Sequence, residues 1–361
     1  MKLTVNTKVL AEAVQALNTI IGGKTTLPIL NFLRLTADVG VLRITATNLE
    51  QTLTVKLAAN VETAGAVTLP AKQLAATMKT VSAEETHLEE QANLRTELMI
   101  GPSRFVLNGL DPTEFPSTPL IAGEQQTVNA HELTLALKSV AFAMSEDENR
   151  FILNSALFEC NDTDIHIVAT DGRRLAKNQI KAQNSLPART AIIPRNAINE
   201  IIKIFSGGEA MTISFDQEKV AFVSNQYELL SRLIDGTYPN YKQVIPNEER
   251  FFAEVQRTEF SETILRAAVV TTDKSSSVKL TFTPNNLHLH ALTPDLGEVE
   301  DNIPCKFNGE QISIGFNPNY LNDPLKVLVH DTIRIGLSDE LSPAVMHADD
   351  YLYVIMPMRL T

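Results

Sequence analysis

The chain has 361 residues, of which 44% are hydrophobic, and it carries 43 acidic against 31 basic residues, a net charge of −12. This length predicts two or three globular domains, and without a charged-then-apolar leader or a long apolar run we expect neither a signal peptide nor a membrane span. The two cysteines, Cys160 and Cys305, have no near partner, so they predict buried thiols in a reducing cytosol rather than a disulfide framework or a zinc site. The acidic total disfavours a nucleic-acid partner unless basic residues cluster.

Each third of the chain repeats one order of elements, a short strand and a helix followed by several strands. In the first third, we expect a strand at residues 3–5 and further strands near 30–36, 41–46 and 51–58. Pro70 is expected to open the second helix, because proline is favoured at the first helical position, and Pro194 has the same role in the middle third. The six predicted helices cover 7–20, 70–80, 131–144, 194–206, 258–270 and 318–329.

The last of these helices contains Pro324, which should remove a hydrogen bond and bend the helix or delay its start. Two polar segments with a proline, 117–126 and 240–250, are expected to be linkers. They give three predicted domains of similar length, 1–121, 122–247 and 248–361.

Apolar residues recur at one spacing through the whole chain. The spacing is 123 residues and then 122, and it relates three sets of positions: Leu42, Ile165 and Leu287; Ile44, Ile167 and Leu289; Ala46, Ala169 and Ala291. Matches this numerous, in order and at one spacing, indicate a threefold internal repeat.

The middle copy of the repeat runs from Arg150 to Leu175 and holds the most unusual local pattern. Two strand-like segments are expected on either side of a polar turn at Asn161 to Asp164. The tripeptide that begins at Thr170 predicts a second turn, followed by Arg173, Arg174 and Leu175. We expect this turn to place two charges and one apolar side chain at an exposed edge.

The charges are unevenly divided between helices and the rest of the chain. With the fifth window extended to 257–270, the six helical windows hold nine basic and six acidic residues, a net of +3, whereas the remainder carries −15. Solvated lysines on helices would explain part of this difference, so the pattern suggests a basic helical surface without establishing it.

Candidate catalytic and metal-binding patterns are incomplete. The segment 20–26 resembles the end of a phosphate-binding loop, but it lacks the required glycine and follows a helix, so Lys24 is interpreted as a basic residue at a loop tip. His288 and His290 have the spacing of two metal ligands, but we expect no carboxylate or cysteine nearby to complete a site. Asp171 has no base or nucleophile beside it, and Asp-Gly is common in tight turns. We therefore predict no catalytic residue, no metal and no cofactor.

The C-terminal segment 351–361 is apolar and rich in methionine, whereas chain ends are usually polar. Two interpretations fit this segment: a last strand packed into its own core, and an adaptable surface groove. Both can hold if the strand forms the first part of the segment and the groove the second.

Taken together, these motifs resemble the bacterial sliding clamp, the beta subunit of DNA polymerase III. The motifs are LPIL at 27–30, ATDGRRLA at 169–176, IIPR at 192–195, DGTYPNY at 235–241, GFN at 315–317 and MPMRL at 356–360. The resemblance covers the whole chain. It implies an α+β DNA-clamp fold of three similar domains, each with two helices and antiparallel sheets, and a head-to-tail dimeric ring around sequence-independent duplex DNA.

The family also implies a non-catalytic processivity factor for DNA replication in the cytoplasm. Its implied partners are a second copy of the chain, the DNA polymerase III alpha subunit, the clamp loader and other proteins with a clamp-binding peptide. The implied dimer contacts are Arg104, Phe105, Val269 and Val270. The implied DNA-facing residues are Lys24, Lys72, Lys79, Phe151, Ile152 and Arg195. The implied peptide-binding pocket comprises Arg150, Leu153, Thr170, Gly172, Arg173, Arg174, Leu175, Pro239, Val244, Asn317, Tyr320, Val354, Met356, Pro357, Met358 and Arg359.

Three positions depart from the family's pattern. Arg173 replaces a common histidine, Gln243 replaces a basic residue, and Pro324 interrupts a helix that the family keeps regular. Two alternatives stay open beside the clamp: an enzyme, for example a hydrolase acting at Asp171, and a protein-binding repeat scaffold that does not encircle DNA.

Overall fold

The structure, a computed structural model, describes residues 1–22, 25–117, 121, 125–205, 207, 210–271 and 277–359, with the backbone alone at position 186. The chain forms two compact units. Unit 1 consists of Met1–His131 and Lys203–Leu233, and unit 2 consists of Glu132–Ile202 and Ile234–Thr361. Each is described by itself.

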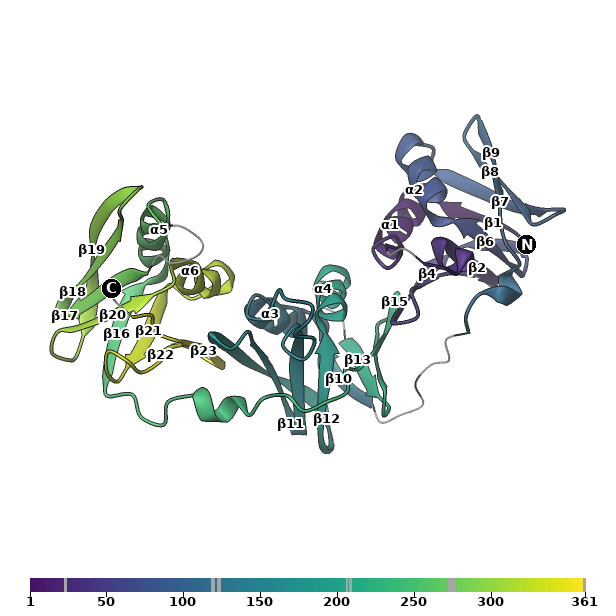
Figure 1. Cartoon of the computed structure of the whole chain (residues 1–361). Helices are drawn as coiled ribbons and strands as arrows, with labels where there is room; N and C mark the ends of the chain where they lie inside the picture. The colour runs from purple at the N-terminus through teal and green to yellow at the C-terminus, as the bar shows by residue number, and fades with distance from the viewer. Residues whose placement is uncertain are drawn as a thin grey trace. The chain divides into compact units, whose positions relative to one another are not determined.

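The described residues form six α-helices, each close to a predicted window. Asn6 caps the first of them, because its side-chain oxygen accepts a hydrogen bond from the backbone N–H of Val9 (3.1 Å). Within unit 1, α1 and α2 pack on each other, and within unit 2, α5 packs on α6 (Figure 1). The helices are α1 (Thr7–Leu17), α2 (Ala71–Thr80), α3 (Ala130–Ala141), α4 (Arg195–Ile204), α5 (Arg257–Ala268) and α6 (Pro318–Val327).

The expectation that Pro70 and Pro194 are the first helical residues is wrong by one position. Each proline is the last residue of a strand, and the helix begins at the next residue. Pro70 pairs with Phe32 and Pro194 with Ser155 across their sheets. Because of this pairing, each proline belongs to the sheet and not to the helix. The backbone of Pro70 is extended, with a ψ of 117°.

Unit 1 contains two antiparallel sheets. The first has the order β5-β1-β7-β8-β9, and the second has the order β10-β13-β14-β15-β4-β3-β2-β6. The second sheet joins strands from the first and middle repeats, because β15 pairs with β4 from Tyr227↔Val55 to Ser231↔Gln51. Its strands and those of the first sheet are β1 (Lys2–Asn6), β2 (Phe32–Asp38), β3 (Val41–Thr47), β4 (Gln51–Ala58), β5 (Asn60–Thr63), β6 (Gly65–Pro70), β7 (Glu85–Gln91), β8 (Arg95–Ile100), β9 (Ser103–Asn108), β10 (Gln125–Asn129), β13 (Ala210–Phe215), β14 (Lys219–Val223) and β15 (Tyr227–Arg232).

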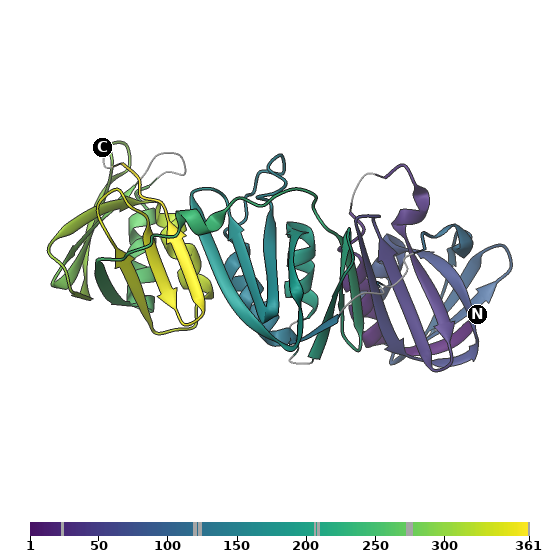
Figure 2. The same ribbon diagram turned by 90° about the horizontal axis from the view of Figure 1, so that it is seen from below.

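Unit 2 contains one extended antiparallel sheet with the order β11-β12-β23-β22-β21-β16-β19-β18-β17-β20. It joins the middle and third repeats through β12 and β23, which pair from Arg174↔Ile355 to Lys177↔Leu352. Figure 2 shows the strands of this unit toward the viewer and its helices behind them. The strands are β11 (Ser155–Thr170), β12 (Arg174–Pro194), β16 (Phe251–Gln256), β17 (Val278–Thr283), β18 (Asn285–Thr293), β19 (Gly297–Phe307), β20 (Ile312–Phe316), β21 (Thr332–Leu337), β22 (Ala344–Ala348) and β23 (Tyr351–Ile355). Three 3-10 turns complete the described elements: Pro28–Asn31, Pro112–Glu114 and Tyr241–Val244.

The repeated apolar positions occupy the same environment in all three copies. They lie on β3, β11 and β18, and each is at most 1% exposed. Alternate residues of a strand point to the same face of a sheet. The three apolar residues of each strand, which are two positions apart, therefore all point into the core. The structure therefore confirms the repeat as a repeat of core positions.

The predicted turn at Asn161 to Asp164 lies within β11 rather than between two separate strands. Pairing with β12 continues across it but shifts register twice, between Cys160 and Asp162 and between Asp162 and Asp164. Asp162 has φ 55°, in the left-handed region that aspartate tolerates better than most residues. The polar sequence therefore marks a backbone irregularity in a strand that the prediction had divided.

Helix α6 continues through Pro324, and its start is not delayed. Asn317 caps it by accepting hydrogen bonds from the N–H groups of Asn319 (2.9 Å) and Tyr320 (3.2 Å). Pro324 has no N–H to donate to the carbonyl of Tyr320 four residues earlier. The hydroxyl of Tyr353 on β23 donates to that carbonyl instead, at 2.8 Å. A tertiary hydrogen bond thus replaces the missing helical one.

None of the helices in the described ranges is both long enough and apolar enough to cross a membrane.

Candidate functional site

The turn after β11 is a hydrogen-bonded unit built from Thr170 and Asp171. The Asp171 side chain accepts from the backbone N–H groups of Arg173 (2.8 Å) and Arg174 (3.1 Å). The Thr170 hydroxyl donates to the carbonyl of Arg174 (2.6 Å) and accepts from the N–H of Gly172 (3.1 Å). Gly172 has φ 89°, and a Cβ there would lie 3.3 Å from the Arg150 guanidinium. Asp171 therefore shapes the turn, which agrees with its interpretation as a turn residue.

The expectation that this turn exposes two arginines and one leucine is wrong for Arg174 and for Leu175, which is 1% exposed. Arg173 is exposed, but Arg174 is only 9% exposed. Its guanidinium donates to Asp171 (3.0 Å), to Asp323 on α6 (2.5 Å) and to the carbonyl of Phe142 (2.7 Å). It also lies over the ring of Tyr320, 4.3 Å from the centroid. Two carboxylates, a carbonyl and an aromatic face compensate for its burial.

The charge on Arg174 is stabilised in this environment. Burial by itself lowers the pKa of an arginine. The pKa is raised by Tyr353, by the hydrogen-bonded carboxylate of Asp323 and by Asp171. The net effect is a pKa of Arg174 above its ordinary value. Arg174 thus joins the turn to α6 as a permanent cation.

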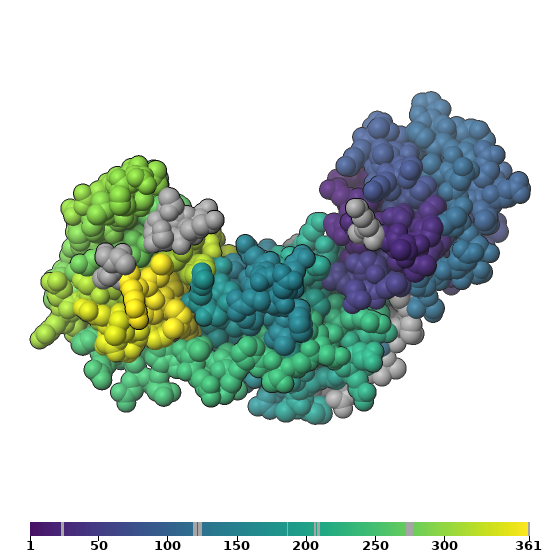
Figure 3. All heavy atoms as spheres, viewed as in Figure 1, coloured from purple at the N-terminus to yellow at the C-terminus, as the bar shows by residue number. Residues whose placement is uncertain are grey.

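The segment after β23 is fixed against two different elements. The N–H of Met356 donates to the carbonyl of Arg173 (3.0 Å), and the N–H of Met358 donates to the carbonyl of Gly315 on β20 (2.7 Å). Strand β23 itself is buried apart from Leu352, which is half-buried. The expectation of a core strand is confirmed, and Met356 to Arg359, which follow it, are exposed or half-buried and form a surface lip. Figure 3 shows the end of the described chain, drawn in yellow, at the surface.

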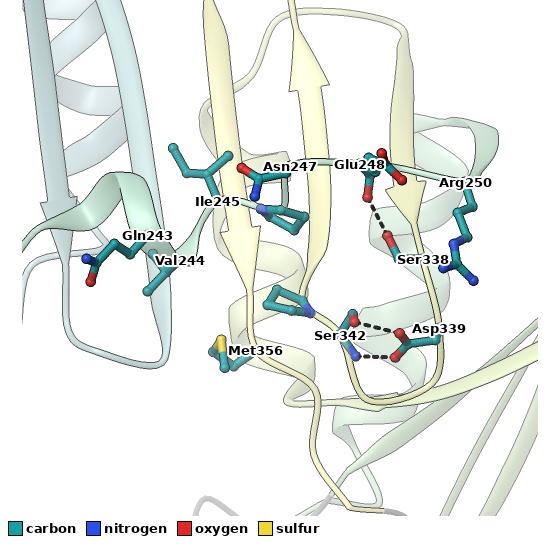
Figure 4. A pocket seen from close by; sticks show the side chains of 12 residues that line it. Gln243, Val244, Ile245, Asn247, Glu248, Arg250, Ser338, Asp339, Ser342 and Met356 are labelled. Atoms are coloured by element: carbon teal, nitrogen blue, oxygen red, sulfur yellow. Dashed lines mark hydrogen bonds between the residues drawn. The ribbon is translucent and has the colours of Figure 1, made fainter.

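A pocket of about 510 Å³ opens beside this lip (Figure 4). Its polar wall is ordered by hydrogen bonds: the Ser338 hydroxyl donates to the Glu248 carbonyl (2.6 Å), and Asp339 accepts from the N–H (2.7 Å) and hydroxyl (2.8 Å) of Ser342. The hydrogen bonds from Ser342, with one from the N–H of Leu341, lower the pKa of Asp339 below its usual range. The pocket is lined by Gln243, Val244, Ile245, Pro246, Asn247, Glu248, Arg250, Ser338, Asp339, Ser342, Pro343 and Met356.

A buried apolar cluster lies between the 170–175 turn and the linker after β15. Ile245 contributes to both this cluster and the pocket wall. Burial raises the pKa of the Tyr238 hydroxyl, which accepts a hydrogen bond from the Thr170 N–H (3.2 Å). The cluster therefore gives the surface above it a rigid base. Its buried members are Leu157, Val168, Leu175, Ile192, Tyr238, Tyr241, Val345 and Val354.

The predicted pocket residues fall into three groups in the structure. Val244 and Met356 line the pocket directly. The side chains of four predicted residues are buried: Thr170, Arg174, Leu175 and Val354. The others are exposed or half-buried: Arg150, Leu153, Gly172, Arg173, Pro239, Asn317, Tyr320, Pro357, Met358 and Arg359.

Sequence reasoning missed most of the lining residues. Ile245 and Pro246 follow the short 3-10 turn, whereas Ser338, Asp339 and Pro343 belong to the loop between β21 and β22. No motif marks them, because they are brought together by the pairing of β21 with β22 and by the path of the linker. Gln243, noted as a departure from the family, is also among the lining residues.

The predicted DNA-facing residues that the structure describes are accessible. Lys72 and Lys79 lie exposed on α2 in unit 1. In unit 2, Phe151 is 57% exposed at the tip of a loop closed by a hydrogen bond from the Ser145 N–H to the Leu153 carbonyl (2.8 Å). Ile152 and Arg195 are half-buried, and the Arg195 guanidinium donates to the carbonyls of residues 144 (3.2 Å) and 145 (3.0 Å). Lys24 lies outside the described residues.

The predicted dimer residues also lie at the surface. In unit 1, Arg104 is exposed and Phe105 half-buried on β9, the last strand of the five-stranded sheet. In unit 2, Val269 is 78% exposed and Val270 half-buried directly after α5.

The two cysteines are buried, as expected, and burial raises the pKa of each thiol to about 11.

The expectation for the two histidines, His288 and His290, is wrong. No carboxylate was expected near His288 and His290, but Glu298 and Glu300 on the neighbouring strand lie close to His290. The reason is the hairpin register, which sequence spacing did not reveal.

Comparisons with known proteins agree along the whole chain. Three models of the DNA polymerase III beta subunit match, the N-terminal domain at residues 1–119, the central domain at 127–240 and the C-terminal domain at 242–359. The chain is 30% identical to the beta sliding clamp of Vibrio cholerae, over all of both proteins, and 30% identical to that of Chlamydia pneumoniae, over all of this chain and 99% of the relative.

Solved structures give the same result. A sliding clamp from Pseudomonas aeruginosa bound to griselimycin superposes with a TM-score of 0.95 at 28% identity, and the sliding clamp of Bacillus subtilis with 0.94 at 26%. Each comparison covers 100% of both chains. The fold is therefore a three-domain DNA clamp, of the class of non-catalytic processivity factors. The chain belongs to the family of bacterial beta sliding clamps, the beta subunits of DNA polymerase III.

Proposed function

We propose that two copies of this chain close head to tail into a ring around duplex DNA and tether the replicative polymerase to it. Membership of the clamp family along the whole chain is the observation that carries the proposal. The three domains would be 1–121, 122–247 and 248–361, and the ring would act in the cytoplasm. The partners would be the DNA polymerase III alpha subunit, the clamp loader and other proteins with a clamp-binding peptide.

Two unpaired strand edges support the dimer. In unit 1, β9 ends its sheet, and among the described residues it pairs with β8 alone. In unit 2, residues 297–305 of β19 pair with β18 on one side, while β16 pairs only with residues 306 and 307. Proteins normally cover long exposed edges, because such edges promote association. Pairing of β9 from one copy with β19 of another would cover both.

The side chains near these edges suit such a contact. β19 carries Glu298, Glu300 and Asp301, whereas Arg104 lies on β9. Phe105 on β9 and Val269 after α5 add apolar surface. A contact with an apolar centre and a charged rim has the composition of a specific protein interface.

The DNA contacts would be few and independent of sequence. Lys72, Lys79 and Arg195 would face phosphates, as would Lys24, and Phe151 and Ile152 would lie against the backbone. Phosphate contacts position a protein without reading bases, so the ring would slide. Its retention would depend on topology and not on a high density of positive charge.

The surface around the pocket would hold the partner's peptide. Val244 and Met356 line the pocket directly, and the exposed predicted residues, among them Arg150 and Arg173, would form its rim. The pocket has a polar wall and an apolar part, and its apolar part would take the leucine and phenylalanine anchors of a short peptide.

The ring is tested by loading the protein onto nicked circular DNA with a clamp loader and ATP, and then cutting the circle. We expect the bound protein to survive moderate salt on the circle and to be lost once the DNA is linear. Equal retention on both forms, with the same salt dependence, would show ordinary electrostatic binding. Failure to remain on either form while peptide binding persists would favour the protein-binding scaffold.

A further inference from the structure

The turn after β3 in unit 1 is built like the turn after β11 in unit 2. The Asn48 side chain accepts hydrogen bonds from the backbone N–H groups of Glu50 (3.1 Å) and Gln51 (2.7 Å). Asp171 accepts from the two N–H groups at the same places of its own turn. The repeat spacing of 123 residues relates Asn48 to Asp171, so the two turns occupy one position in their repeats.

A threonine completes each of the two turns in the same way. The Thr47 hydroxyl donates to the carbonyl of Gln51 (3.0 Å) and accepts from the N–H of Leu49 (3.1 Å), and Thr170 makes the two equivalent hydrogen bonds. In the third copy the threonine is replaced by Leu292, which has no hydroxyl. The first two repeats therefore share a turn that the third does not have.

Leu49 has a backbone conformation that suits glycine. Its φ is 75°, and Gly172 at the equivalent position has φ 89°. A bulky side chain is rare in this left-handed region, because its Cβ comes too close to the following carbonyl oxygen. Leu49 is also 49% exposed, so burial in a core does not compensate for the strain. Strained residues of this kind are concentrated at ligand-binding sites.

Leu49 lines a cavity of about 320 Å³ in unit 1, together with Leu27 and Leu30. Leu27 is 47% exposed, whereas Leu30 is buried in a cluster with Ile29 and Phe115. The N–H of Leu30 donates to the carbonyl of Leu27 (3.2 Å), so both leucines belong to one turn. The cavity therefore combines exposed apolar side chains with a packed base, which is the composition of a binding pocket.

The three leucines of this cavity occupy the places of three predicted residues of the peptide pocket in unit 2. The hydrogen bond from the Leu153 N–H to the Arg150 carbonyl (2.8 Å) matches the one between Leu30 and Leu27. The backbone of this part of the pocket is therefore present twice, and its first copy has leucines in place of an arginine and a glycine. The equivalent pairs are Leu27 and Arg150, Leu30 and Leu153, and Leu49 and Gly172.

The charges beside the two turns have opposite signs. Glu50 is exposed next to Leu49, whereas the equivalent Arg173 is exposed next to Gly172. Arg232 is also exposed, and its N–H donates to the Glu50 carbonyl (2.9 Å), so it offsets part of the acidic charge. Like charges disfavour a partner. The site in unit 1 should therefore prefer a peptide with a basic flank, and the site in unit 2 one with an acidic flank.

We propose that Leu27, Leu30 and Leu49 form a second peptide site on the chain, for a short segment with leucine or phenylalanine anchors and a basic flank. This site rests on the proposed function, since the peptide pocket of unit 2 is its model. None of its three leucines is assigned to the dimer or to DNA. One chain would then hold two partner peptides of opposite charge at the same time.

The test is fluorescence anisotropy of the full-length protein with two labelled peptides. Both carry the same leucine and phenylalanine anchors, one between lysines and the other between glutamates. We expect Leu49→Gly to weaken binding of the lysine-flanked peptide by about tenfold or more, because an anchor contact is lost. Glycine suits a φ of 75°, so the midpoint of chemical denaturation should not fall. Leu94→Gly is the matched control, because Leu94 is 46% exposed with φ 58° and lies outside the cavity.

Arg173→Ala separates this site from the peptide pocket of unit 2. It should weaken the glutamate-flanked peptide and leave the lysine-flanked peptide unchanged. Absence of glutamate-flanked binding alone would count against the pocket of unit 2, while a loss of lysine-flanked binding in Leu49→Gly would still support the site in unit 1.

Two results would overturn the second site. The first is binding of the lysine-flanked peptide that is equal in the wild type and in Leu49→Gly, or absent from the folded wild type. The second is equally tight binding of a lysine-flanked peptide with alanine at both anchors, which would show attraction to the acidic surface alone.

Discussion

Arg173 and Arg174 are neighbours in the sequence but have different environments and different roles in the structure. Arg173 is exposed, whereas Arg174 is buried between two carboxylates and an aromatic ring. Removing one member of a buried charged network leaves the others uncompensated, so the effect on stability is large. A substitution at an exposed position away from such contacts has little effect.

We expect Arg174→Ala to lower the free energy of unfolding by about 3 kcal/mol, because Asp323 and Asp171 would lose their buried partner. Arg173→Ala should change stability by less than about 0.5 kcal/mol but weaken binding of a peptide with leucine and phenylalanine anchors. Chemical denaturation and fluorescence anisotropy measure the two effects. An Arg174→Ala protein as stable as the wild type would contradict the structural role, and unchanged peptide binding by Arg173→Ala would remove that residue from the pocket rim.

At the scale of elements, α6 shows how a tertiary contact corrects a local defect. Pro324 deprives the Tyr320 carbonyl of its helical donor, and the Tyr353 hydroxyl takes that place at 2.8 Å. Tyr353 is fully buried, and burial raises its pKa, so the hydroxyl stays protonated and able to donate at neutral pH. This hydrogen bond therefore links helix α6 to strand β23.

Tyr353→Phe should accordingly loosen α6 by about 1 kcal/mol, the contribution of a typical hydrogen bond. The effect should shrink when Pro324→Ala is also present, because alanine restores an N–H donor to the Tyr320 carbonyl. Hydrogen exchange of peptides covering 318–328, compared among the two single variants and the double variant, measures this coupling. Equal effects of Tyr353→Phe in both backgrounds would show that the hydroxyl does not replace the missing helical bond.

The elements that could be predicted are those with a strong local pattern. Each predicted helix has one apolar face, and α6 was recognised despite Pro324 because its period survives. The turn at Asn161 to Asp164 could not be interpreted correctly, since continued pairing with β12 is not a local property. For the same reason the pocket wall from Ile245 to Pro246 and the group around His290 were missed, although the family resemblance supplied Val244 and Met356.

At the scale of the whole molecule, the compact units do not coincide with the three repeats. The middle repeat gives β15 to the sheet that contains β4, and β12 to the sheet that contains β23. Its strands are therefore divided between unit 1 and unit 2. Sequence periodicity identified the repeat. It could not predict which strands of different repeats pair, because that pairing depends on contacts between residues far apart in the sequence.

Ring closure gives the molecule's most direct large-scale prediction. Val269 lies 78% exposed after α5, near the proposed contact, and Val329 has the same exposed fraction elsewhere in unit 2. Val269→Glu would bury a carboxylate against the apolar part of the second copy and raise the dimer dissociation constant by about tenfold or more, whereas Val329→Glu should not. Both substitutions add the same charge at the same exposure, so a difference between them reports the location of the contact. Sedimentation velocity over a dilution series measures the constant, and loss of protein from circular DNA should follow it. Equal dimer affinities for the two variants would mean that the ring closes through a different surface.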